Sequence, residues 1–201
     1  MSNFNEVEID IPADVELIYD SSLTSCKISI KAREDVLERI KTDVDVGDLL
    51  IDSRRCISSD SPIEIKLYFN ELNRLELNGA GHIISLNTIA SDFFKLNLNG
   101  SGGVNLDMEV LELEAKLSGS GNINVTGGAE SIVTNLTGSG NVKTSTVLSK
   151  KADIKISGSG NVKVYASEEL DVNISGSGNV YYKGGPIVDV KITGSGDVVK
   201  F

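Results

Sequence analysis

The chain has 201 residues, of which 40% are hydrophobic, so it is long and apolar enough for one domain with a buried core. Lys and Arg together number 19 against 29 Asp and Glu, and the resulting net charge of −10 argues against nucleic acid and anionic membrane surfaces as partners. No stretch approaches the length of an apolar transmembrane span.

Residues 1–73 are predicted to form irregular leading coils rich in β-strand. Only residues 32–40 look helical, with an apolar stripe of Val36, Leu37 and Ile40. The terminal units of repeat proteins are normally atypical, so this segment is expected to cap the repeats that follow. The strands are predicted from alternating apolar and polar residues or short apolar runs, and they cover residues 7–11, 15–19, 26–30, 49–51 and 63–67.

The same segment holds both cysteines of the chain and its N-terminus. Cys26 shares strand parity with Ile28 and Ile30, which predicts a buried thiol, whereas Cys56 follows a polar stretch expected to be a loop. A disulfide between them stays open, and the absence of a CxxC spacing argues against a zinc site. The first residues lack the basic and apolar regions of a signal peptide, so the protein is either cytoplasmic or begins after a removed leader.

A Gly-Ser-Gly tripeptide recurs through residues 74–201, which are predicted to form one continuous repeat domain. Gly79-Ala80-Gly81 is a variant copy, and from one first glycine to the next the steps are 21, 19, 19, 20, 18 and 18 residues. A fixed period in this range is the signature of a solenoid. The other copies begin at Gly100, Gly119, Gly138, Gly158, Gly176 and Gly194.

Each tripeptide is flanked by residues that alternate between apolar and polar. The residue two positions before the first glycine is Leu or Ile in every copy, as at Leu117, Leu136 and Ile156. The residue three positions before the first glycine is polar in every copy. After the glycines the alternation resumes with Ile or Val. This period of two predicts a strand with one buried face on each side of a glycine corner.

The interval between tripeptides leaves no room for a helix and its connections. A leucine-rich-repeat horseshoe or a βαβ array is therefore disfavoured, and the strand after each corner argues against a phosphate-binding glycine loop, which needs a helix there. A coil of this length, at ~3.3 Å per residue, has room for about three short strands. Stacking such coils ~4.8 Å apart predicts an all-β parallel β-helix, with a rod of roughly 30 Å for the repeats.

Two rows of polar residues occupy equivalent positions in successive repeats. The first row is predicted to form a structural ladder of amide hydrogen bonds, with a ligand-facing row as the alternative, and comprises Asn122, Asn141, Asn161 and Asn179. The second row could hold calcium or act in catalysis, but Lys155 and Lys191 lie two residues along and favour a solvated ion-pair ladder. This second row comprises Asp153, Asp171 and Asp189.

No catalytic residue, metal site or cofactor is assigned from the sequence. His82, the only histidine, has no acid or nucleophile at the equivalent position of the next repeat and is predicted to be a surface turn residue. The serines between the glycines lack a histidine that could activate them. Tyr165, Tyr181 and Tyr182 are weak candidates for stacking on a sugar; alternatively, they cover the last coils.

The Gly-Ser-Gly corners, the strands around them and the leader that ends in residues 62–67 resemble the putative auto-transporter adhesin family, also called the head GIN domain. Residues 40–44, 49–51 and 72–79 are similar to that family's leading segment, and the resemblance runs from about residue 4 to the C-terminus. It implies a right-handed parallel β-helix, usually bacterial, exported to the periplasm, the cell surface or the medium. It also implies no established catalytic residues and a role in adhesion.

Three functional hypotheses follow. The first is a non-catalytic adhesin-like module that binds glycan or a host or cell-surface protein through its outer faces. The second is a polysaccharide-active enzyme on a β-helix scaffold. The third is a self-assembling structural module, because residues 198–201 follow the last corner without a capping element and an open final coil favours a homo-oligomer.

Overall fold

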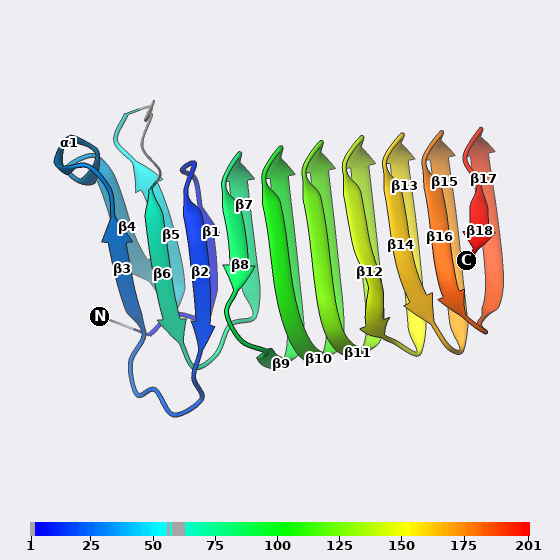
Figure 1. The fold of residues 1–201 in the computed structure, drawn as a ribbon, viewed down its shortest axis with the longest axis horizontal. Coiled ribbons are helices and arrows are strands. Elements are labelled where there is room, and N and C mark those ends of the chain that lie inside the picture. The colour runs from blue at the N-terminus through cyan, green and yellow to red at the C-terminus, as the bar shows by residue number, and fades with distance from the viewer. Residues whose placement is uncertain (1–2, 56, 58–62) are drawn as a thin grey trace.

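Each coil of the repetitive half consists of two strands joined at a glycine corner (Figure 1). The computed structural model describes residues 3–55, 57 and 63–201. One ladder of parallel strands precedes the corners and consists of β7 (Arg74–Gly79), β9 (Ile89–Gly100), the second halves of β10 (Gly103–Gly119) and β11 (Asn122–Gly138), β13 (Lys151–Gly158), β15 (Glu169–Gly176) and β17 (Ile187–Gly194).

The second ladder follows the corners and is parallel throughout. It consists of β8 (His82–Ser85), the first halves of β10 and β11, β12 (Asn141–Leu148), β14 (Asn161–Ala166), β16 (Asn179–Gly184) and β18 (Val198–Lys200). In Figure 1 the nearer strands run downward and the farther strands upward while the chain advances to the right, so the solenoid is right-handed.

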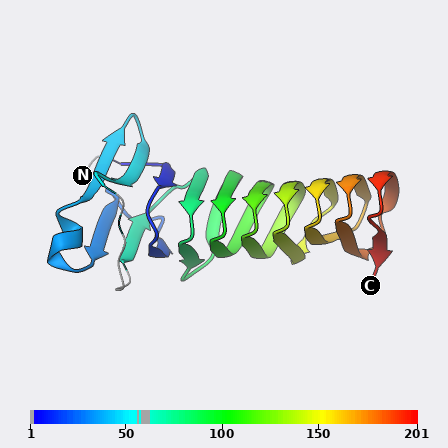
Figure 2. The same ribbon diagram turned by 90° about the horizontal axis from the view of Figure 1, so that it is seen from above.

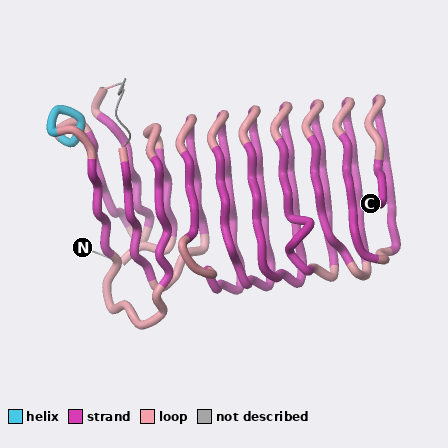
Figure 3. The backbone as a smooth tube through the Cα atoms, viewed as in Figure 1, coloured by secondary structure: helices cyan, strands magenta, loops and turns pink. Residues whose placement is uncertain are grey.

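The coils contain two strands each, and the expectation of about three was wrong. In β10, buried residues alternate with more exposed ones from Val104 to Val110 without a break, so one continuous strand replaces the separate short strands that were expected. The long strands β10 and β11 continue from one ladder into the other around the bend. A register shift between β11 and β12, near Thr126, accompanies the kink that Figure 3 shows in the tube.

Apolar side chains from successive coils stack in the interior, as the sequence predicts. Leu117 pairs with Leu136 and Leu136 with Ile156 in the parallel register, and each is at most 2% exposed. The cluster of buried apolar residues runs from Phe4 to Val180. Parallel in-register stacking therefore converts one apolar position per repeat into a continuous row of the core.

The glycine corners let consecutive coils approach closely. The first glycine of each corner has a positive φ, 127° at Gly119 and 118° at Gly138. A Cβ at Gly138 would overlap the carbonyl oxygen of Gly119 in the coil below. The corner therefore needs glycine for its backbone conformation and for the space that a side chain would occupy.

The N-terminal segment joins the same ladders out of sequence order. β1 (Glu6–Ile9) and β2 (Asp14–Tyr19) form a coil that lies between β7 and β8 on one side and β5 (Asp48–Ser53) and β6 (Glu64–Phe69) on the other. All these pairings are parallel, so the repetitive stack extends into the leader although the leader has no Gly-Ser-Gly corner.

The outer end of the leader is closed by antiparallel strands. β3 (Lys27–Lys31) pairs with β6 and β4 (Ile40–Asp45) pairs with β5. The helix expected over residues 32–40 is shorter: α1 covers Glu34–Leu37, because Ile40 already begins β4. Figure 2 shows that this capping segment is broader than the row of coils. No helix in the described part of the chain is long and apolar enough to cross a membrane.

Candidate functional site

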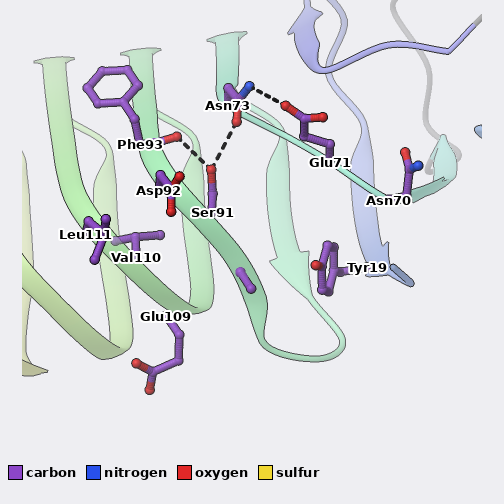
Figure 4. Close-up of a pocket in the computed structure, with 11 residues that line it drawn as sticks. Tyr19, Asn70, Glu71, Asn73, Ser91, Asp92, Phe93, Glu109, Val110 and Leu111 are labelled. Carbon is purple, nitrogen blue, oxygen red and sulfur yellow. Dashed lines mark hydrogen bonds between the residues drawn. The ribbon is translucent and has the colours of Figure 1, made fainter. Parts of the chain in front are cut away.

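A hollow of about 770 Å³ lies where the regular coils meet the capping segment (Figure 4). Its walls come from the end of β2, the segment before β7, the start of β9 and the bend of β10. Tyr19, Phe93 and Leu111 supply ring and apolar surface, and Phe93 and Leu111 are 41% and 52% exposed. Large apolar side chains that stay this exposed beside a concavity are a common feature of binding sites.

Hydrogen-bonding side chains lie among these apolar groups. The Ser91 hydroxyl is 3.0 Å from Oδ1 of Asn73 and 2.9 Å from the carbonyl oxygen of Phe93. The Asn73 amide donates to Oε1 of Glu71 at 3.0 Å. Figure 4 shows this chain of contacts along one side of the hollow, with Asp92 beside Ser91. The contacts hold the polar groups in place before any ligand arrives.

The hollow exists because the chain changes course beside it. β8 ends at Ser85 and β9 begins at Ile89, and between them the side chain of Asn87 takes the place of a strand against β2. Its Oδ1 accepts the Tyr19 N–H at 3.0 Å and its Nδ2 donates to the Tyr19 carbonyl at 2.6 Å. Beyond Tyr19 the leader turns away at Asp20, so it does not cover the start of β9. This leaves the edge of the regular stack open.

The hollow is acidic. Glu71, Asp92 and Glu109 line it, and Lys and Arg are absent from the described residues of its wall. In Figure 4 the carboxylate of Glu109 extends away from Asp92 and Ser91, and Glu71 lies on the far side of Asn73. The three carboxylates thus lie at different parts of the wall of the hollow.

A second groove follows the Asn row toward the C-terminal end. Two adjoining hollows of about 390 and 430 Å³ share Asn141, Asn161 and Lys163. Tyr181 and Phe201 line its end, and the Lys163 ammonium lies 5.9 Å from the Tyr181 ring centre and 6.0 Å from that of Phe201. This groove combines cations with rings, in contrast to the acidic hollow.

The four asparagines at the sequence-predicted positions lie in one row and contact one another. Asn141 donates to Oδ1 of Asn122 at 3.0 Å, Asn161 to Asn141 at 3.3 Å and Asn179 to Asn161 at 3.1 Å. The Asp197 N–H continues the row by donating to Asn179 at 3.0 Å. Their amide groups are therefore engaged with one another along the edge of the groove.

The aspartates of the second row also occupy one register. Asp153 pairs with Asp171 and Asp171 with Asp189 across β13, β15 and β17. Lys155 forms an ion pair with Asp153 at 3.1 Å. Within residues 3–55, 57 and 63–201, no group of three or more His, Cys, Asp or Glu side chains is placed to hold a metal ion.

His82 has an acidic neighbour that the repeat alignment did not reveal. Its Nδ1 lies 3.5 Å from Oδ1 of Asp14, and both side chains are more than half exposed. Asp14 belongs to β2, which pairs with β8 although it lies far away in the sequence. The alignment considered only the coil that follows His82, whereas its partner is in the coil on the other side.

The three candidate tyrosines do not share a surface. Tyr182 pairs with the buried Val164 and packs against the core, so it points inward. Tyr181 is on the outer side, where its ring meets Phe201 at a centroid distance of 6.4 Å. Tyr165 lies on β14, the strand of the ladder that precedes β16, and pairs with Lys183. Only Tyr181 among them lines a described groove.

The thiol of Cys26 is buried, 2% exposed, and lies 3.6 Å from the Phe4 carbonyl oxygen. Cys56 lies outside the described residues, as do residues 58–62 of the leader. A disulfide between Cys26 and Cys56 is therefore not tested by the structure and stays open.

The main hollow was missed by the sequence reasoning. Its residues come from segments that are remote in sequence, and most lie where the repeat is irregular. The sequence offered one usable signal, because Phe93 and Leu111 are apolar where the next coil carries an acidic residue. Glu112 pairs with Phe93, and Glu130 lies opposite Leu111.

Comparison with protein families identifies the family of the chain. The sequence model of the family described as putative auto-transporter adhesin, head GIN domain, matches residues 3–186. The chain belongs to this family. No curated protein matches it.

Solved structures share its fold over the whole chain. A putative adhesin from Bacteroides fragilis superposes with a TM-score of 0.92 at 17% identity, covering 100% of this chain and 94% of that chain. A protein described as a putative lipid binding protein from Parabacteroides distasonis has a TM-score of 0.81 at 28% identity, with coverage of 100% and 94%. A putative adhesin from Parabacteroides merdae has a TM-score of 0.78 at 22% identity, with coverage of 100% and 93%.

Proposed function

We propose that this head GIN domain protein is a non-catalytic adhesin-like module of the bacterial cell surface or of the secreted fraction, and that it binds a glycan in the hollow between cap and coils. The family description and the similar structures named as adhesins support a binding role. The observation that carries the glycan assignment is the combination, in one hollow, of exposed rings with amide, hydroxyl and carboxylate groups.

The chemistry of the hollow suits a sugar. The hydrophobic faces of a pyranose pack against rings such as Phe93 and Tyr19, while its hydroxyls donate to carboxylate and amide oxygens. A volume of about 770 Å³ lies in the range of ligand sites and has room for a short oligosaccharide segment. The site is also shaped largely without the ligand, because Asn73, Ser91 and Glu71 already bond to one another.

The charge of the hollow narrows the class of glycan. Three carboxylates and no described cation line it, so sulfated or uronic-acid-rich chains would be repelled. Neutral sugars and amino sugars fit, and an amino group would gain from Asp92 or Glu109. The groove with Lys163 and Tyr181 offers the opposite charge and is the competing surface for an acidic ligand.

A glycan array followed by calorimetry on the ligand that binds would test this function. We expect a neutral or amino-sugar glycan to bind and Phe93→Ala or Asp92→Ala to weaken it at least about tenfold, since each removes one anchor of the hollow. Both side chains are partly or fully exposed, so the variants should keep the wild-type unfolding transition. Tyr165→Ala, on the outer face away from the hollow, is the matched control.

Other outcomes would contradict the proposal in distinguishable ways. Loss of binding in Tyr181→Ala but not in Phe93→Ala would move the site to the C-terminal groove. Binding of a protein and of no glycan would retain an adhesin and reject the ligand class. Turnover of a bound glycan, measured as new reducing ends, would reject the non-catalytic assignment.

A further inference from the structure

The last strand of the first ladder, β17, has one open edge. β17 pairs with β15 on one side, and no described residue pairs with it on the other. Its inward positions are consequently uncovered: Val190 and Ile192 are 41% and 40% exposed, whereas Val172 and Ile174, their partners on β15, are 4% and 0% exposed. An open strand edge with exposed apolar residues favours pairing with another strand.

The opposite end of the solenoid is closed differently. There β3 and β4 turn antiparallel to the stack, and α1 joins them. The strands at that end expose Lys27 and Lys31 on β3 and Lys41 and Asp43 on β4. This end does not offer a parallel coil that could receive β17, so head-to-tail stacking of copies is disfavoured.

The backbone groups available on β17 are those of its even-numbered residues. Ile187 donates its N–H to Glu168 in the preceding coil, and Ser195 donates to Gly176. Because backbone groups alternate sides along a strand, Val188, Val190 and Ile192 direct their N–H and C=O groups to the open edge. A second copy of β17, paired antiparallel and centred on Val190, would satisfy all three, because Val190 would then face Val190 and Val188 would face Ile192.

The sequence of β17 is complementary to itself when it is reversed about Val190. In an antiparallel pair centred there, Val190 meets Val190 of a second copy and Val188 meets Ile192, so the inward rows of both copies join. On the outer side Asp189 of one copy faces Lys191 of the other. The twofold axis that relates the copies produces this contact a second time. These two positions form the pairs without direct hydrogen bonds, where opposite side chains approach most closely.

We infer that β17 is a dimerisation strand whose partner is a second copy of the same chain, paired antiparallel about Val190. Charge selects this register. Centres at Asp189 or Lys191 would oppose like charges and use backbone groups already bonded to β15, while centres at Val188 or Ile192 leave both charges without an opposite partner. Among the described residues, Asp189 and Lys191 have no ion-pair partner within the chain, so both are available.

Charge reversal tests the register. Sedimentation velocity of the full chain over a range of concentrations should show a monomer–dimer equilibrium. Asp189→Lys and Lys191→Asp should each raise its dissociation constant about tenfold or more, because each change creates like-charge contacts twice. The double variant Asp189→Lys/Lys191→Asp should restore the wild-type constant. Asp153→Lys, on the same outer row two strands from the edge, is the matched control and should leave the dimer unchanged.

The charge-reversed variants should fold like the wild type, because both positions are on the outer side of the strand. A lysine at position 189 would also lie beside Asp171. A chain that stays monomeric at all concentrations overturns the inference, as does growth beyond a dimer. A dimer that ignores both single changes would use another interface. A double variant that fails to recover would reject the antiparallel register.

Discussion

At the scale of single residues, the corner glycines limit what the chain can tolerate. Gly138 has a φ of 118°, and a Cβ there would meet the carbonyl oxygen of Gly119. Each coil rests on the corner of the preceding coil through such a contact, so the tripeptide is a packing requirement as well as a turn. A glycine outside the corners need not meet this requirement.

Replacement of Gly138 by Ala should therefore destabilise the fold by roughly 2–3 kcal/mol, through backbone strain and through the displaced coil. Gly185→Ala is the matched control, because no atom lies within 4 Å of a Cβ built there, and its effect should stay within about 0.5 kcal/mol. Urea unfolding followed by circular dichroism measures both. Equal effects of the two substitutions would show that the corner contact is not what makes Gly138 necessary.

At the scale of elements, the Asn row connects neighbouring strands of the second ladder at their edge. Asn161 both donates to Asn141 and accepts from Asn179, whereas the structure gives Asn122 only the role of acceptor from Asn141. Asn122 is the first of the row because Gly103 stands at its position in the preceding coil. We propose that the row stabilises the stack of strands, and the two positions allow a test.

Asn161→Asp should lower the free energy of unfolding by about 1 kcal/mol at neutral pH, since a carboxylate cannot donate and would face the Asn141 oxygen. Asn122→Asp keeps the acceptor that Asn141 uses and should change stability much less. The comparison of the two denaturation curves separates the hydrogen bond from the added charge. If both substitutions have the same effect, the charge alone is responsible and the ladder has no structural role.

At the scale of the whole molecule, the described strands of each coil pair only with those of the coils beside it, so stability is distributed along the axis. The core row is fully buried at β13 and β15 and becomes half-exposed at β17. A solenoid of this kind opens most easily from an uncovered end. The capped end carries β3, β4 and α1 and lacks this weakness.

Hydrogen exchange should reveal the difference. At concentrations well below the dissociation constant of the proposed dimer, amides of β18 and of the even-numbered residues of β17 should exchange fastest, and those of β10 to β13 should exchange slowest. Mass spectrometry of peptic fragments would measure the gradient. Uniform protection from β10 to β18 in the monomer would contradict the expected fraying.

Much of the architecture is readable from the repeat. The period, the inward Leu and Ile positions and the glycine corners predict a parallel β-solenoid, and the buried register of Leu117, Leu136 and Ile156 agrees. Such features depend on local backbone preference and on alternation, both of which a sequence displays directly. The family resemblance predicted from the same residues is also confirmed by the match over residues 3–186.

The remaining features were decided by contacts between distant segments. The insertion of β1 and β2 between β6 and β8, the approach of Asp14 to His82 and the hollow beside Phe93 all join residues from different parts of the chain. The number of strands per coil also depended on where the long β10 bends. Sequence alone determined the repeating unit because each unit encodes its own alternation and corner. Tertiary structure decided the cap and the hollow because no period relates the segments that meet there.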